Sequence, residues 1–204
     1  MAVTFDTAYE KALVDIAALN PFATAARSGA IFENGKFRLP FFNRVFAVSH
    51  PQATIEEVGV AAKPPRYLEL LLLHYLVCAD GSGVADSWVT YRLLPGASLF
   101  EQRFQTRAIA PLARAFGNDV ERFRKAAESI GGTPMSRTGD AAYRFLAFPR
   151  LPVGCILYLG EEDIPASVNI LFDEAAPHYL PTEDLSIVGS YLSGALRGFQ
   201  IAMT

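Results

Sequence analysis

The acidic side chains in the last quarter of the chain are the residues whose types best suit chemistry. Residues 151–196 contain no Lys or Arg, and their acids are Glu161, Glu162, Asp163, Asp173, Glu174, Glu183 and Asp184. Carboxylate oxygens are the ligands that Mg²⁺ and Ca²⁺ take, and two carboxylates in different environments can act as acid and base. A solvated acidic turn with a helix N-terminus, or ion pairs with the basic segment 92–150, would account for the same residues.

The histidines and cysteines offer a second kind of chemistry. His74 and Cys78 stand four residues apart in a predicted helix, so they share one face. Imidazole and thiolate are ligands for zinc and similar metals. Cys155 and His178 would complete a Cys2His2 set, although no knuckle spacing joins the four. A histidine and a cysteine within a leucine run are more often core residues, so both interpretations stay open.

Three further side chains have the chemistry to hold a ligand. His178, between Pro177 and Tyr179, could serve as a general base, as an axial ligand to a tetrapyrrole metal, or as an exposed loop residue. Arg92 and Arg150 each end a predicted strand, where a guanidinium can bind carboxylate or phosphate or can pair with the acids of the 161–163 turn. The predicted ligand-binding residues are Arg92, Arg150, Glu161, Glu162, Asp163, Asp173, His178 and Tyr179.

The first sixty residues predict two helices followed by short strands. Apolar residues recur at three- and four-residue steps over 4–19, and Pro21 suits the first turn of a second helix over 21–27. From residue 30 the period changes to two, and Asn34-Gly35 accepts the positive φ angles of a tight hairpin turn. The predicted strands are 30–32, 36–39, 44–49 and 54–60.

Residues 65–79 predict a helix that is apolar on nearly every face after Glu69. A helix that is apolar all round is a buried helix, so we expect this one at the centre of the fold. Its longest apolar run, residues 70–79, is far short of the ~20 residues that a membrane span needs. No membrane contact is therefore expected.

The remainder of the chain alternates between strands and helices. Strands are predicted over 87–93, 141–148, 153–159 and 168–172. Helices are predicted over 98–115, with an interruption at Pro111, and over 118–130 and 182–197. The pattern indicates an α+β fold with a largely antiparallel sheet packed by several helices. No linker interrupts it, so residues 1–204 are expected to form a single domain.

Composition narrows the classes of function. The formal net charge is −3 over 204 residues, and no basic stripe appears, which argues against nucleic-acid binding. Two distant cysteines give no disulfide framework, which favours a reducing compartment. The N-terminus lacks the basic and apolar regions of a secretory signal, so a cytoplasmic location is expected.

Short motifs along the chain resemble an uncharacterised bacterial and archaeal family, a domain of unknown function. They are Ser28-Gly29-Ala30, His74-Tyr75-Leu76, Trp88, residues 92–96, Phe148-Pro149-Arg150, residues 160–165, Leu171-Phe172-Asp173 and Tyr179-Leu180 with Glu183-Asp184. Some relatives are fused to a cysteine-rich iron–sulfur module, which implies a link to redox or corrinoid one-carbon metabolism. This chain has two cysteines, so it cannot ligate a [4Fe–4S] cluster alone and would need an iron–sulfur partner protein.

Three functions follow as hypotheses. The first is a binding or accessory domain that holds a small ligand or cofactor, such as a corrinoid or another tetrapyrrole, in an aromatic pocket. The second is a metal-assisted hydrolase or lyase that uses the 161–184 carboxylates with His178 or His74. The third is a structural or assembly subunit. The sequence names no cofactor and fixes no oligomeric state.

Overall fold

The computed structural model describes residues 4–136 and 139–198, which divide into two compact units. Among these residues, unit 1 comprises 4–83, 148–150 and 178–180, and unit 2 comprises 84–136, 139–147, 151–177 and 181–198. Unit 1 thus includes two three-residue segments from the second half of the chain. The single domain expected over residues 1–204 stays a prediction.

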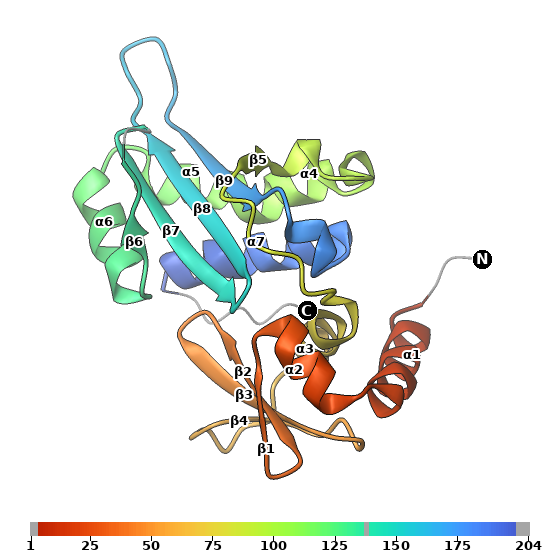
Figure 1. Cartoon of the computed structure of the whole chain (residues 1–204). Helices are drawn as coiled ribbons and strands as arrows, with labels where there is room; N and C mark the ends of the chain where they lie inside the picture. The colour runs from red at the N-terminus through yellow and green to blue at the C-terminus, as the bar shows by residue number, and fades with distance from the viewer. Residues whose placement is uncertain (1–3, 137–138, 199–204) are drawn as a thin grey trace. The chain divides into compact units, whose positions relative to one another are not determined.

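Capping residues set the ends of the first two helices of unit 1. Helix α1 (Phe5–Ala18) begins after Thr4, whose side chain accepts from the backbone N–H of Thr7. Helix α2 (Pro21–Ser28) begins after Asn20, which accepts from Ala23 in the same way, and ends at Gly29 with a left-handed φ of 75°. Figure 1 shows both near helix α3 (Arg66–Cys78), which each of them contacts.

Helix α3 forms the centre of the core of unit 1. The buried residues on this helix are Leu68, Glu69, Leu70, Leu71, Leu72, Leu73, Tyr75 and Leu76. The apolar surface on most of its circumference is therefore removed from water, which is the main stabilising contribution in such a core. The buried central helix predicted near 65–79 is confirmed.

The sheet of unit 1 is a four-stranded antiparallel meander. Strands β1 (Ile31–Glu33), β2 (Lys36–Phe41), β3 (Arg44–Ser49) and β4 (Ile55–Glu57) pair in chain order. The turn between β1 and β2 has positive φ at both Asn34 and Gly35, as the pair predicted. Alternate residues of β2 are buried, so one face of this strand packs into the core.

The sheet of unit 2 has five strands in the order β5-β9-β8-β7-β6. Their bounds are Trp88–Thr90 for β5, Thr133–Pro134 for β6, Ala141–Phe148 for β7, Leu151–Tyr158 for β8 and Ser167–Asp173 for β9. Strand β8 is buried from Leu151 to Leu157, as expected for the central strand. Figure 1 shows the helices of this unit on one side of the sheet.

The helical region before the central strands of unit 2 is broken into pieces. Its parts are η2 (Ala97–Leu99), α4 (Glu101–Phe104), the π turn η3 (Gln105–Ile109), α5 (Ala110–Phe116) and α6 (Val120–Ser129). A helical region over 98–115 with an interruption at Pro111 was predicted, and the helix widens into the π turn just before that proline. Proline has no N–H to donate, and its ring crowds the carbonyl four residues earlier.

The predicted strand over 87–93 is shorter than expected. Strand β5 stops at Thr90, and Tyr91–Leu93 form the 3-10 helix η1. Tyr91 turns into the core, where its ring stacks on Phe104 with centroids 4.1 Å apart. Burial of this aromatic ring outweighs continuation of a strand at the sheet edge.

The α+β class is confirmed, and the strands form two antiparallel sheets in place of one. The last long helix, α7 (Thr182–Leu196), follows the short 3-10 helix η4 (Ala176–His178). Within residues 4–136 and 139–198, no helix combines the length and apolarity needed to cross a membrane.

Candidate functional site

Unit 1 brings several of the family motifs together around Tyr75. The Tyr75 ring stacks on the ring of Phe148, with centroids 4.1 Å apart and planes 9° apart. The ring of Tyr179 also stacks on that of Tyr75, with centroids 5.8 Å apart. The Tyr75 hydroxyl donates to the carbonyl oxygen of Ser28 at 2.7 Å and accepts from the N–H of Arg150 at 3.1 Å. One buried side chain therefore fixes segments from three parts of the sequence.

His178 forms a hydrogen bond with Asp80 at the surface of unit 1. The imidazole Nδ1 lies 2.7 Å from Asp80 Oδ2, and both side chains are about half exposed. Asp80 also accepts from the N–H of Ser82 at 2.8 Å. This backbone hydrogen bond, followed by those from the Ser82 and His178 side chains, lowers the pKa of Asp80 to about 2.

The state of Asp80 fixes the tautomer of His178. An ionised carboxylate only accepts hydrogen bonds, so Nδ1 carries the proton and donates. Among the described residues Nε2 has no hydrogen-bond partner, and the ring is exposed. A neutral His178 therefore presents the lone pair of Nε2 to solvent. That atom can bind a metal or accept a proton from a substrate.

Two arginines of unit 1 make close contacts with backbone segments. Arg150 donates from Nη2 to the carbonyl oxygen of Ala26 at 3.1 Å, near the end of α2. A Cβ on Gly81 would lie 3.2 Å from Cγ of Arg27, so Arg27 packs against the residue after Asp80.

The Nε atoms of Arg27 and Arg150 are buried and have no hydrogen-bond partner among the described residues. Within the described part of unit 1, neither arginine has an ion pair. A buried donor without a partner calls for an explanation, such as a bound water or ligand. Arg27 was not among the predicted site residues. Its position in the last turn of α2, just before the Ser28 motif, is the sequence signal that could have found it.

The predicted metal ligands lie in different environments. His74 is half-buried and Cys78 is exposed, both on α3 of unit 1, whereas Cys155 is fully buried on β8 of unit 2. Burial raises the pKa of the Cys155 thiol, which disfavours the thiolate that binds metals. Within the described residues no group of three or more His, Cys, Asp or Glu could hold a metal ion. The Cys2His2 metal site therefore stays a prediction that no cluster of ligands among the described residues supports.

Asp173 in unit 2 has its carboxylate occupied by backbone donors. One oxygen accepts from the N–H groups of Ala85 and Ala175, each at 2.9 Å, and the other accepts from Asp86 at 2.8 Å. The side chain is 1% exposed. Asp173 thus anchors the segment before β5 to the end of β9, and the structure offers a structural account of this acid.

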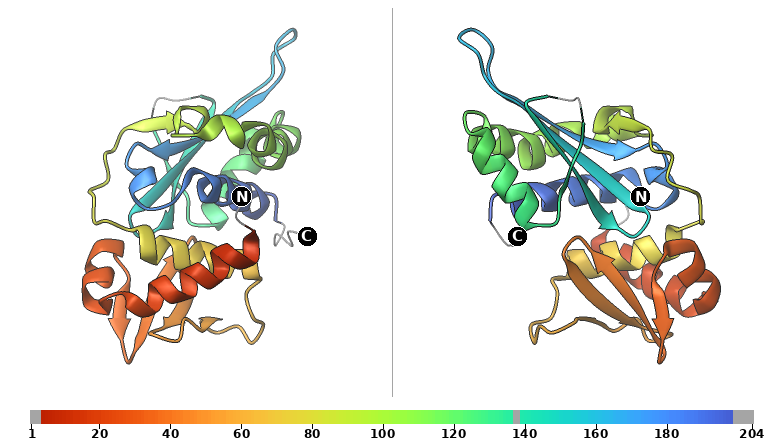
Figure 2. Two further views of the ribbon diagram at one scale, coloured as in Figure 1. Left: turned by 90° about the vertical axis from the view of Figure 1, so that its right-hand side faces the viewer. Right: turned by 60° about the vertical axis from the view of Figure 1, so that its left-hand side comes forward.

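Glu161, Glu162 and Asp163 are exposed in the loop between β8 and β9. Figure 2 shows this loop projecting beyond the sheet of unit 2, and Glu161 pairs through its backbone with Ile164. Arg92 is exposed in η1, one turn after β5, and not at a strand end as predicted. In the described part of unit 2, no ion pair joins Arg92 to these three acids.

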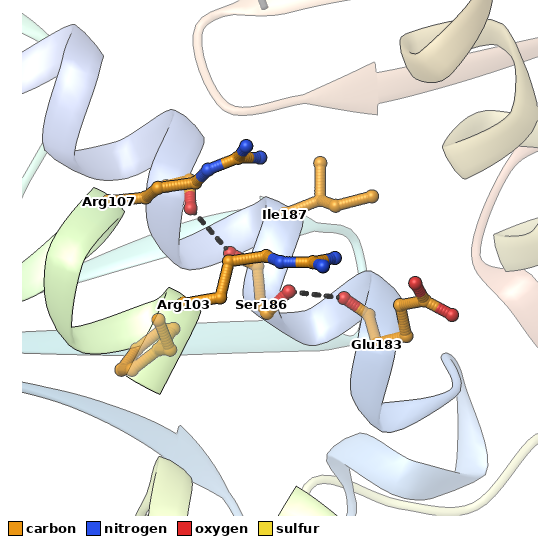
Figure 3. Close-up of a pocket in the computed structure, with 7 residues that line it drawn as sticks. Arg103, Arg107, Glu183, Ser186 and Ile187 are labelled. Carbon is orange, nitrogen blue, oxygen red and sulfur yellow. Dashed lines mark hydrogen bonds between the residues drawn. The ribbon is translucent and has the colours of Figure 1, made fainter. Parts of the chain in front are cut away.

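Unit 2 also contains a pocket of about 90 Å³ that the sequence reasoning missed. The residues that line it are Arg103, Phe104, Arg107, Glu183, Ser186, Ile187 and Ser190. Figure 3 shows the two guanidinium groups extending beside α7. The detectable signal was the shared spacing of four residues between the two arginines and between the two serines, which puts each pair on one helix face. The two acids at the start of α7 have different surroundings: Glu183 lines the pocket, whereas Asp184 is buried.

These features define an α+β protein in whose described residues no group of three or more His, Cys, Asp or Glu could hold a metal ion. Residues 20–195 match the family described as Domain of unknown function (DUF3786), and the chain belongs to that family. The match spans residues of both units. Comparisons with curated proteins and with solved structures gave no match.

Proposed function

We propose that this chain is an accessory domain that binds a small ligand or cofactor, and that unit 1 supplies the contacts through His178, Arg150 and Arg27. The Asp80–His178 pair carries the proposal. It orients an exposed imidazole and leaves Nε2 available. A carboxylate that accepts from the second nitrogen is the usual way in which proteins orient a metal-binding histidine.

The chemistry of the site favours a metal that arrives inside a cofactor. A single oriented imidazole supplies one ligand, so the other ligands must come with the metal, as they do in a corrinoid or another tetrapyrrole. The side chains of Arg27 and Arg150 would bind carboxylate or phosphate groups of the same ligand. The family resemblance to proteins with iron–sulfur modules is in keeping with this proposal and extends it to an iron–sulfur partner protein.

Absorbance titration tests the proposal, with hydroxocobalamin and hemin as probes. We expect one of them to bind and its visible bands to shift. The variant His178→Ala should lose the shift, and Asp80→Asn should weaken binding because the imidazole is no longer oriented. The control His50→Gln alters a histidine of unit 1 whose Nε2 lies 3.1 Å from the Leu19 carbonyl. Absence of a shift with both probes, or an unchanged shift in His178→Ala, would contradict the proposal.

The Asp80–His178 pair also favours a second function, the metal-assisted hydrolase or lyase. An imidazole oriented by a carboxylate is an effective general base. The divalent ion of this function would be bound in the exposed loop between β8 and β9 by fewer than three of Glu161, Glu162 and Asp163, because no larger group among the described residues could hold a metal ion. Calorimetric titration with Mg²⁺, Mn²⁺ and Zn²⁺ against wild type and Asp163→Asn tests this function, and no heat of binding would exclude it. The assembly role predicts a salt-sensitive oligomer by light scattering.

A further inference from the structure

The pocket of unit 2 combines both signs of charge within a small volume. Its arginines, Arg103 on α4 and Arg107 on the π turn η3, stand one turn apart and extend along α7 (Figure 3). Glu183 lines the same pocket from the first turn of α7.

The two arginines are available for a ligand. Both side chains are exposed, and neither forms an ion pair among the residues of unit 2 that the structure describes. Guanidinium groups remain charged at all physiological pH values and bind carboxylates through two parallel hydrogen bonds. Arg107 belongs to a π turn, a feature that frequently occurs at functional sites. This side of the pocket therefore suits a carboxylate.

The opposite side of the pocket offers acceptors. The Ser186 hydroxyl donates to the carbonyl oxygen of Glu183 at 2.6 Å, and the Ser190 hydroxyl donates to that of Ser186 at 2.8 Å (Figure 3). Each hydroxyl has thereby used its hydrogen, and its oxygen keeps lone pairs for a donor from a ligand. The carboxylate of Glu183 adds a negative charge. This side therefore suits an ammonium group.

A second carboxylate, that of Glu101, belongs to α4 but does not line the pocket. One oxygen of Glu101, Oε2, is buried and has no partner within the described residues. Burial, together with the carboxylates of Glu101 and Glu183, raises the pKa of Tyr91 to about 12.

We propose that this pocket binds a small molecule with both a carboxylate and an ammonium group, of the α-amino acid class. The carboxylate would bind Arg103 and Arg107, and the ammonium would bind Glu183 and the Ser186 hydroxyl. A volume of about 90 Å³ is several times the roughly 10–15 Å³ that one water molecule needs. The two charged ends of a small amino acid fit such a space, and a short side chain would face Ile187 or the opening.

Calorimetric titration with glycine, L-alanine, acetate, methylamine and phosphate tests the proposal. We expect glycine or L-alanine to bind at least tenfold more tightly than acetate and methylamine, because each of those probes engages one side of the pocket. The double variant Arg103→Gln/Arg107→Gln and the variant Glu183→Gln should each weaken amino acid binding about tenfold or more, which corresponds to the loss of one charged hydrogen-bond pair. Lys125→Gln, which removes an exposed positive charge from α6 of the same unit, should bind as wild type does.

Three results would overturn the inference. The first is that neither glycine nor L-alanine binds detectably. The second is that acetate or phosphate binds as tightly as the amino acids do. The third is that the arginine double variant binds amino acids as tightly as wild type does. All the substituted side chains are exposed, so each variant should unfold at the wild-type temperature in the absence of probe. These outcomes are independent of the hydroxocobalamin and hemin titrations, because His178 and Asp80 belong to unit 1.

Discussion

The ring of Tyr75 stacks on that of Phe148 at a centroid distance of 4.1 Å, and both side chains are fully buried in unit 1. Phe148 immediately precedes Pro149 and Arg150, so the stack fixes the backbone from which the Arg150 side chain extends. The aromatic core of unit 1 and its candidate ligand site are therefore one structure, and substitutions in the first should affect the second.

Tyr75→Phe should destabilise the protein by about 1–3 kcal/mol. The ring can still stack, but the Ser28 carbonyl loses its donor and the Arg150 N–H loses its acceptor. Urea denaturation followed by fluorescence measures the change. Tyr158→Phe removes a hydroxyl from a side chain that is 37% exposed, and its free energy of unfolding should stay within about 0.5 kcal/mol of wild type. Equal effects of the two substitutions would show that the buried hydroxyl makes no net contribution.

Asp173→Asn should destabilise unit 2 by about 2–3 kcal/mol. The amide places a donor where the carboxylate accepts from the backbone N–H groups of Ala85, Asp86 and Ala175. The matched control is Glu174→Gln at the neighbouring exposed residue, with an expected change within about 0.5 kcal/mol. A wild-type unfolding midpoint for Asp173→Asn would show that this acid is free to serve a ligand.

Asp80 should contribute to the acid dependence of stability. Its pKa is about 2 in the folded state and near 3.9 when unfolded, so between these values the unfolded state binds more protons. Stability from Asp80 is therefore present above about pH 4 and is lost as the pH falls toward 2. The melting temperature of Asp80→Asn should vary less than that of wild type over this interval.

Gly189→Ala should destabilise unit 2 by about 1–3 kcal/mol. A Cβ there would lie 2.5 Å from Cε2 of Phe104, so α7 or the stacked ring must shift. The helix propensity of alanine opposes this cost by up to ~1 kcal/mol. Gly83→Ala, where an added Cβ meets nothing within 4 Å, is the control. Stabilisation by Gly189→Ala, measured by urea denaturation, would contradict the close contact.

The two cysteines should differ in reactivity toward a thiol reagent such as iodoacetamide. Cys78 is exposed, whereas Cys155 is fully buried and its pKa is raised by burial. Mass spectrometry of the native protein should find one modified thiol, and denaturant should release the second. The variant Cys78→Ser should show no native modification. Rapid native labelling of Cys155 would instead show that the centre of the unit 2 sheet opens readily.

Local patterns were sufficient to predict most of the elements. The apolar surface of residues 65–79 indicates burial whatever its partner is, and Asn34-Gly35 encodes its own turn geometry. The partition of the strands into two sheets could not be predicted, because periodicity reveals which face of a strand is apolar and not which strand lies beside it. Strand β5 pairs with β9, for example, through Val89 and Phe172.

The candidate sites depended still more on tertiary contacts. His178 was predicted as a ligand-binding residue from its type and surroundings, but its partner Asp80 is 98 positions away. Asp173 shared the same acidic segment, and its role was set by three backbone donors that the sequence does not reveal. Acidic composition alone therefore indicates a candidate site less well than the hydrogen-bond partners of individual side chains do.

The inclusion of residues 148–150 and 178–180 in unit 1 has a consequence for synthesis on the ribosome. Helix α3 emerges early, yet the aromatic partners of Tyr75 are Phe148 and Tyr179. Unit 1 cannot complete its core until translation has passed Tyr179. Until then the apolar surface of its amino-terminal helices stays exposed. A polypeptide cut after residue 83 should retain that surface, and chaperones that bind nascent chains would be expected to recognise it.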